Sequence, residues 1–212
     1  MEFSKKILML SIFLVFLNAA IWSVGWVYMP DITGENHVME NVQATCLLLG
    51  TIIFLIASYR ASEKSFRILF ISLGLFYINF FLLEIDLRKI ENHDILLIGI
   101  NPPGRDYWLV AAWMVVFGFF LFNARKTLIT FLAWLQTPQG LVIMAAGLFY
   151  VASVPFDDNV LKLDPKTSKF FEEIMDNIAT TLMLLCAVLT LASNQNLRPA
   201  IHYRPRARPE SL

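Results

Sequence analysis

Acidic and amide side chains gather at three places in the sequence, each beside a long apolar run. Residues three or four apart share one face of an α-helix, so Glu40 would lie with Gln43, Glu172 with Asp176, and Glu173 with Asn177. The first group is Glu40, Asn41 and Gln43, the second is Glu84 and Asp86, and the third is Glu172, Glu173, Asp176 and Asn177.

These residue types suit several kinds of binding chemistry. Clustered carboxylates with neighbouring amides favour a hard divalent cation such as Mg²⁺, Ca²⁺ or Mn²⁺, which prefers oxygen ligands. A candidate metal set combines one histidine with one acid from each group: His37, Glu40, Glu84 and Asp176. The same acids could instead share protons as a relay, or receive the cationic or hydroxylated part of a lipid or peptide.

A simpler interpretation is that these acids are solvated helix ends. The helix macrodipole stabilises an acid in the first turn by about 0.3–1 kcal/mol, which would account for Glu40, Glu172 and Glu173. Two positions favour a site instead. Asp86 follows an apolar run, at a helix C-terminus where the macrodipole disfavours an acid. Asp176 lies more than one turn inside the last apolar run, where an unpaired carboxylate costs kilocalories.

The composition is that of a membrane protein. Hydrophobic residues make up 57% of the 212-residue chain and charged residues 16%, whereas about a quarter of a soluble domain is charged. The charges also come in bursts between apolar runs of about the length needed to cross a bilayer as a helix. The runs predict an all-α protein with six transmembrane helices, at about 7–29, 42–59, 67–85, 107–124, 138–154 and 174–193.

One segment leaves the fifth span open to two interpretations. Residues 127–136 are apolar and precede the fifth run, from which Thr137-Pro138-Gln139-Gly140 separates them. Pro and Gly are typical of turns, so the segment is either an interfacial helix or an early part of the fifth span. The following loop, at about 155–171, contains Pro155 and Pro165 and is predicted to be rich in turns.

The distribution of basic residues predicts the orientation. With six spans, eleven Lys and Arg fall on the side of the N-terminus and six on the other side, which carries fourteen of the seventeen acids. Basic residues accumulate on the cytoplasmic side of membrane proteins, so both termini are expected in the cytoplasm. The three polar groups then share the opposite, outer side.

The chain divides into a single six-span membrane domain over 1–196 and a basic tail over 197–212, rich in Pro and Arg. A basic tail beside a membrane is typically attracted to anionic lipid. The expected partners are therefore membrane lipids and a second membrane protein, and no nucleic acid is expected. The pattern resembles the general look of small bacterial multi-pass proteins, which implies the cell inner membrane and transfers no activity.

These features favour a non-enzymatic membrane protein whose outer-facing, carboxylate-rich pocket binds a cation, a lipid head group or a segment of a partner. One alternative is an intramembrane, metal-assisted hydrolase of lipids that uses the same acids as ligands and general base. Another is a proton- or cation-coupled carrier, although the sequence shows no internal repeat of the kind many carriers have. No catalytic residue can be assigned from these patterns.

Overall fold

The computed structural model describes residues 2–29, 32, 38–84, 110–111, 113–115, 117–118, 121, 124–157 and 160–193. Every regular element within these residues is helical. The longer helices are α1 (Glu2–Tyr28), α2 (Val38–Arg60), α3 (Lys64–Glu84), α6 (Ala124–Leu135), α7 (Pro138–Asp157) and α8 (Pro165–Ser193).

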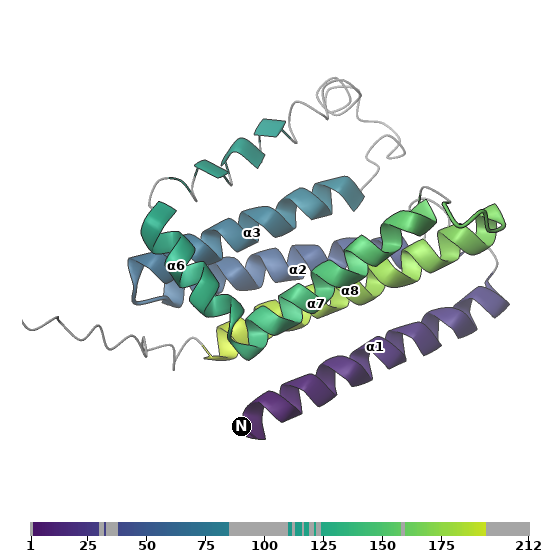
Figure 1. The fold of residues 1–212 in the computed structure, drawn as a ribbon, viewed down its shortest axis with the longest axis horizontal. Coiled ribbons are helices and arrows are strands. Elements are labelled where there is room, and N and C mark those ends of the chain that lie inside the picture. The colour runs from purple at the N-terminus through teal and green to yellow at the C-terminus, as the bar shows by residue number, and fades with distance from the viewer. Residues whose placement is uncertain are drawn as a thin grey trace, which may run out of the picture.

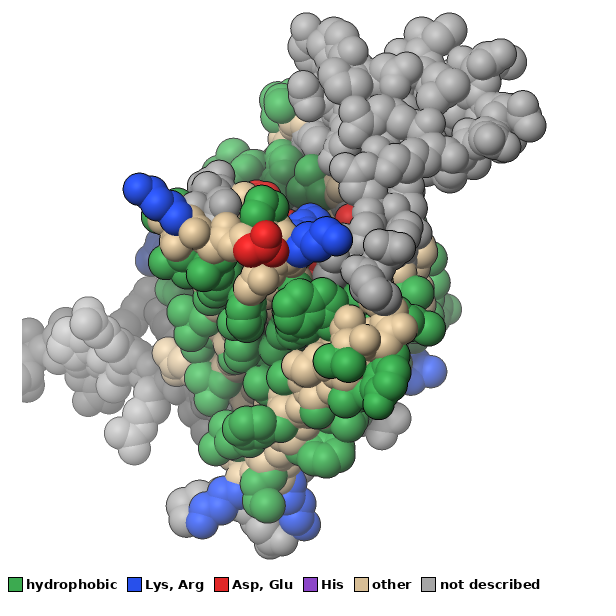
Figure 2. All heavy atoms as spheres, turned by 90° about the vertical axis from the view of Figure 1, so that its right-hand side faces the viewer, with side chains coloured by type: hydrophobic (Ala, Val, Ile, Leu, Met, Phe, Trp, Pro, Cys, Tyr) green, Lys and Arg blue, Asp and Glu red, His purple; other side chains and the backbone are tan. Residues whose placement is uncertain are grey.

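Five of these helices are long and apolar enough to cross a membrane: Ser4–Tyr28, Val38–Arg60, Lys64–Leu83, Pro138–Asp157 and Pro165–Ser193. They match the first, second, third, fifth and sixth predicted spans and are compatible with a multi-pass membrane protein. Figure 2 looks onto one end of the bundle and shows hydrophobic side chains covering most of the described surface. Most of the predicted fourth span, 107–124, lies outside the described residues, as does the tail 197–212.

The long helices run side by side; α1, α3 and α7 run in one direction and α2 and α8 run in the opposite direction (Figure 1). α8 contacts α1, α2 and α7, and α3 packs on the other side of α2. α1 lies at the edge of the bundle and, among the described residues, contacts only α7 and α8. Only 11% of the most apolar stretch of α1 is buried inside the described structure, compared with 56% of the corresponding stretch of α8.

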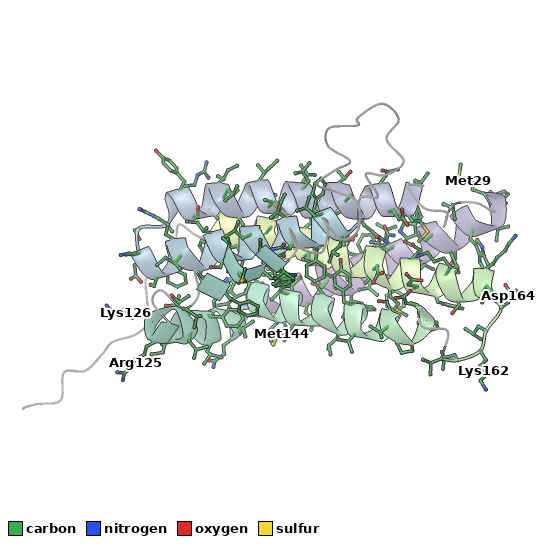
Figure 3. All side chains as sticks on the ribbon, turned by 90° about the horizontal axis from the view of Figure 1, so that it is seen from above. Met29, Arg125, Lys126, Met144, Lys162 and Asp164 are labelled. Atoms are coloured by element: carbon green, nitrogen blue, oxygen red, sulfur yellow. The ribbon has the colours of Figure 1, made fainter. Side chains whose placement is uncertain are left out.

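The two ends of the bundle differ in charge. One end, here called the basic end, holds Lys5, Lys6, Arg60, Lys64, Arg67, Arg125 and Lys126. The other, here called the acidic end, holds Glu40, Asp157, Asp164, Glu172, Glu173 and Asp176, together with Lys162, Lys166 and Lys169. Figure 3 shows Arg125 and Lys126 at one end of the long axis and Lys162 and Asp164 at the other.

A glycine allows α2, α3 and α8 to meet in the core. A Cβ on Gly50 would lie 2.6 Å from Cδ2 of Tyr77, so only glycine leaves room for the ring. Tyr77 is fully buried, and its hydroxyl donates a hydrogen bond of 2.9 Å to the Met183 carbonyl in α8. The Phe54 ring meets the Tyr77 ring edge-on, with centroids 5.1 Å apart.

α6 is a helix of its own and not the first part of α7. It ends at Leu135, and Figure 1 shows it crossing the direction of the long helices at the basic end. The break is formed by Thr137, whose Oγ1 accepts a hydrogen bond from the Gly140 N–H at 3.3 Å. This is an N-cap, and Pro138 occupies the first helical position, where proline is favoured.

The prediction for the start of the last helix was wrong. α8 begins at Pro165 and not near residue 174, and α7 continues through Pro155 to Asp157. Asp164 caps α8, since its Oδ2 accepts a hydrogen bond from the Thr167 N–H at 3.3 Å. Glu172 and Glu173 therefore do not lie in a first turn, and the macrodipole does not account for them. Glu40 does lie in the first turn of its helix, α2.

Candidate functional site

Polar side chains of α2 and α8 meet near the acidic end of the bundle. Because α8 begins at Pro165, the segment 169–177 is regular helix, and residues three or four apart in it lie on one face. α2 packs against this part of α8 and brings its own first turns close. We call the resulting group the α2–α8 polar cluster: Glu40, Gln43, Lys169, Glu172, Glu173, Asp176 and Asn177.

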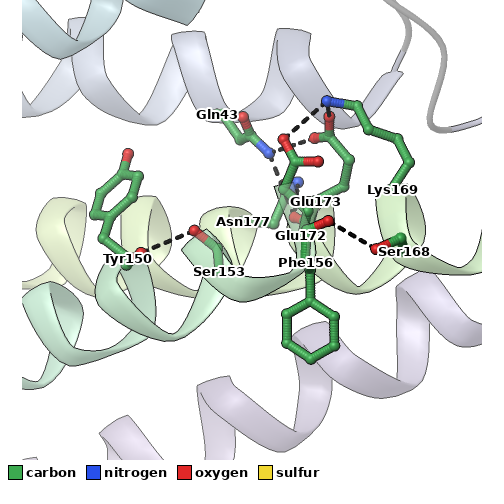
Figure 4. Close-up of polar contacts among 9 residues, drawn as sticks. All are labelled: Gln43, Tyr150, Ser153, Phe156, Ser168, Lys169, Glu172, Glu173 and Asn177. Atoms are coloured by element: carbon green, nitrogen blue, oxygen red, sulfur yellow. Dashed lines mark hydrogen bonds and ion pairs between the residues drawn. The ribbon is translucent and has the colours of Figure 1, made fainter. Parts of the chain in front are cut away.

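One ammonium group serves two carboxylates in this cluster. Lys169 Nζ lies 2.9 Å from Glu172 Oε1 and 3.0 Å from Glu173 Oε1 (Figure 4). The side chain of Glu173 is only 4% exposed, whereas that of Lys169 is 38% exposed. The lysine thus reaches from the surface to neutralise a buried acid, which would otherwise be costly to desolvate.

Gln43 supplies a second hydrogen bond to the buried acid. Its Nε2 donates to Glu173 Oε2 at 2.8 Å and makes a longer contact of 3.4 Å with the Glu173 carbonyl oxygen. Both side chains are almost completely buried. Asn177 Nδ2 donates to the same carbonyl at 3.0 Å. Glu173 is therefore held from α2 and from its own helix, and its position is well defined.

Asp176 faces α7, and its carboxyl group is less completely hydrogen-bonded than that of Glu173. Its carboxyl group lies beside the Ser153 hydroxyl, whose proton is donated to the Tyr150 carbonyl at 2.8 Å. Asp176 Oδ1 is buried, and the structure gives it no hydrogen-bond partner; the same is true of Asn177 Oδ1. Ser168, whose hydroxyl donates to the Phe156 carbonyl at 2.7 Å, ties the start of α8 to α7 nearby.

The cluster carries an excess of negative charge. Glu40 is half-buried in α2 and close enough to repel both Glu172 and Glu173. Glu172 and Glu173 in turn repel Asp176. Lys169 interacts with three of these carboxylates, those of Glu172, Glu173 and Asp176, and pairs directly with the first two. Chemically, an arrangement of this kind can accept a further cationic group.

The predicted site residues are only partly brought together. Glu40, Gln43, Glu172, Glu173, Asp176 and Asn177 lie at the α2–α8 interface or next to it, whereas Asn41 points to the exposed side of α2. His37 and Asp86 lie outside the described residues, as does the side chain of Glu84, so the predicted metal set stays a prediction. Within the described part of the chain, no three His, Cys, Asp or Glu side chains are grouped to hold a metal ion.

Two residues of the site did not emerge from the sequence. Lys169 falls within the loop predicted at about 155–171, although its spacing of three and four residues from Glu172 and Glu173 is typical of helical ion pairs. Nothing in the sequence marks Ser153 as a site residue, because a lone serine in an apolar helix most often bonds to the backbone of its own helix. No protein-family model, curated protein or solved structure matches the chain.

Proposed function

We propose that the chain is a multi-pass protein of the bacterial inner membrane, with six spans and both termini in the cytoplasm. In this proposal the α2–α8 polar cluster faces outward and binds a cationic group, presented by a metal cation, a lipid head group or a segment of a partner protein. The protein acts by binding and not as an enzyme.

The separation of charge along the bundle supports the orientation. Seven Lys and Arg residues gather at the basic end, where Glu63 is the one acid whose side chain is described. The acidic end carries Lys162, Lys166 and Lys169 against a larger number of acids. The excess of basic residues marks the cytoplasmic side, so the cluster belongs on the outer side.

The buried Oδ1 of Asp176 is the observation that carries the binding proposal. A carboxylate oxygen removed from water without a hydrogen bond is unfavourable, and here Glu172 and Glu173 add repulsion. Lys169 is already engaged by these two neighbours. A cation bound beside Asp176 would relieve the repulsion and supply the missing partner.

Thermal unfolding of the full-length protein in detergent tests this proposal. The probes are Mg²⁺, Ca²⁺, Mn²⁺, ethanolammonium and a short lysine peptide, each added at constant ionic strength. A ligand that binds only the folded state raises the unfolding temperature as its concentration passes the Kd. We expect at least one probe to produce a saturating rise.

The variant Asp176→Asn keeps the size of the side chain and removes its charge. We expect it to unfold at a higher temperature than the parent without any probe, and to lose the rise that the probe produces. Thr45→Ala changes an exposed side chain of α2 that belongs to neither polar site; it is the control and should keep the full rise. The proposal is wrong if no probe stabilises the parent, or if Asp176→Asn responds as strongly as the parent.

A further inference from the structure

A pocket with charged residues in its lining lies at the opposite, basic end of the bundle. It has a volume of about 370 Å³ and is formed where α3 and α6 begin. These two helices contact each other. The pocket is lined by Glu63, Lys64, Ser65, Ile68, Lys126 and Thr127. It shares no residue with the α2–α8 polar cluster and is not used in the proposed function.

Several donors surround this pocket. Lys64 and Lys126 are exposed and approach it from different helices. The first backbone hydrogen bond at the start of α3 runs from the Arg67 N–H to the Glu63 carbonyl at 3.0 Å. The N–H groups of the preceding turn, including those of Lys64 and Ser65, have no acceptor within the helix. Such a helix start attracts anions, and phosphate in particular.

Thr127 supplies an independent sign that a ligand group is missing here. It lines the pocket, its side chain is completely buried, and its Oγ1 has no hydrogen-bond partner. A threonine in a helix ordinarily bonds to a carbonyl one turn earlier, as Thr51 does with Leu47. Thr127 Oγ1 is therefore a donor left available toward the pocket.

The surroundings indicate that the ligand is a membrane lipid. Ile68 forms an apolar wall of the pocket and belongs to the candidate span of α3. α6 turns Thr127 and Trp134 inward and leaves Leu128, Ile129 and Leu132 about half exposed. An amphipathic helix of this kind lies in the membrane interface. The pocket is thus at the level where head groups meet acyl chains.

We propose that this pocket binds the phosphoethanolamine head group of a phospholipid. The phosphate lies between Lys64 and Lys126 and accepts hydrogen bonds from the start of α3 and from Thr127 Oγ1. The carboxylate of Glu63 pairs with the ammonium group. A head group with negative charge alone would face repulsion from Glu63, and one with a quaternary ammonium could not donate a hydrogen bond to it.

Native mass spectrometry of the full-length protein tests this inference. The probes are phosphatidylethanolamine, phosphatidylglycerol and phosphatidylcholine with identical acyl chains, and inorganic phosphate alone. We expect the ethanolamine lipid to be retained best. The double variant Lys64→Gln/Lys126→Gln should bind it about tenfold more weakly, which corresponds to about 1.4 kcal/mol. Thr127→Val, which keeps the side-chain shape, should also weaken it.

Matched variants separate this site from general attraction to a basic surface. Arg125→Gln removes a charge next to Lys126 that does not line the pocket, and it should bind the ethanolamine lipid as the parent does. Glu63→Gln should lose the preference for ethanolamine over glycerol head groups. The inference is overturned if Arg125→Gln weakens binding as much as the double variant, if the glycerol or choline lipid is preferred by the parent, or if only inorganic phosphate binds.

Discussion

The side-chain amide of Gln43 in α2 donates a hydrogen bond of 2.8 Å to the carboxylate of Glu173 in α8, and both side chains are buried. These residues are 130 positions apart in the sequence. Their contact fixes the rotation of α2 relative to α8, because a slip of either helix would leave a buried carboxylate short of a donor. The stability of the bundle should depend on it.

Gln43→Leu should lower the free energy of unfolding by about 1.5–3 kcal/mol, the range for a hydrogen bond to a charged group. The measurement is equilibrium or thermal unfolding of the purified protein in detergent. Thr45→Ala is the control, since Thr45 is exposed and its hydroxyl bonds only to the Asn41 carbonyl of the same helix. Equal stability of Gln43→Leu and Thr45→Ala would contradict the role given to Gln43.

Lys169→Met should destabilise the protein by about 1–2 kcal/mol, because it removes the ammonium group from two acids while part of the ion pair is open to solvent. Adding Glu173→Gln should restore part of the loss, since an amide needs no counter-ion. Lys166→Met, at an exposed position one turn earlier, should be nearly neutral. A double variant less stable than Lys169→Met alone would count against this account.

Gly50→Ala should destabilise the bundle by about 1–3 kcal/mol, the usual cost of overpacking a core. The added Cβ would meet the Tyr77 ring, which is held by its hydrogen bond to Met183. Gly147 lies in α7 with no atom within 4 Å of its added Cβ. Gly147→Ala should therefore stabilise the helix slightly. Unfolding temperatures of the two variants that shift in the same direction would refute the prediction.

The proposed orientation can be read by labelling single cysteines with a membrane-impermeant maleimide. Cys46 and Cys186 are free and buried, so their background reaction should be low. Lys162→Cys should react in intact cells, and Arg125→Cys only after the membrane is permeabilised. The reverse pattern would invert the topology and place the α2–α8 polar cluster in the cytoplasm.

The sequence predicted the helices well where hydropathy alone decides them. The runs that became α1, α2, α3 and α7 stand out because each is apolar for most of its length. The beginning of α8 does not stand out in this way, because its first turns carry four charged residues: Lys166, Lys169, Glu172 and Glu173. The local signal for that beginning was Asp164 followed by Pro165, a cap and a first-turn proline.

The candidate site was less predictable, because topology fixes the depth of a residue in the membrane and not its neighbours. Glu40 and Glu173 could be placed near the same end, but nothing in the sequence pairs α2 with α8 in the membrane plane. That pairing depends on packing, for instance on the close approach of Gly50 to Ala187, whose Cβ would lie 4.0 Å from a Cβ added to the glycine. The ion pairs of Lys169 are local in sequence and became recognisable only once the helix was known to include residue 169.

The position of α1 at the edge of the bundle has a consequence for how the protein is made. The described contacts of α1 are with α7 and α8, and the hydrogen bond from Thr181 to Asn18 spans 163 residues. At about 5–20 residues per second, a ribosome needs on the order of ten seconds to synthesise that interval. In a bilayer, α1 would spend this time without α7 and α8, the helices that it contacts in the described structure. Its candidate span has the highest mean hydropathy of the five, 2.3, which suits a helix that must be stable in the bilayer on its own before assembly is complete.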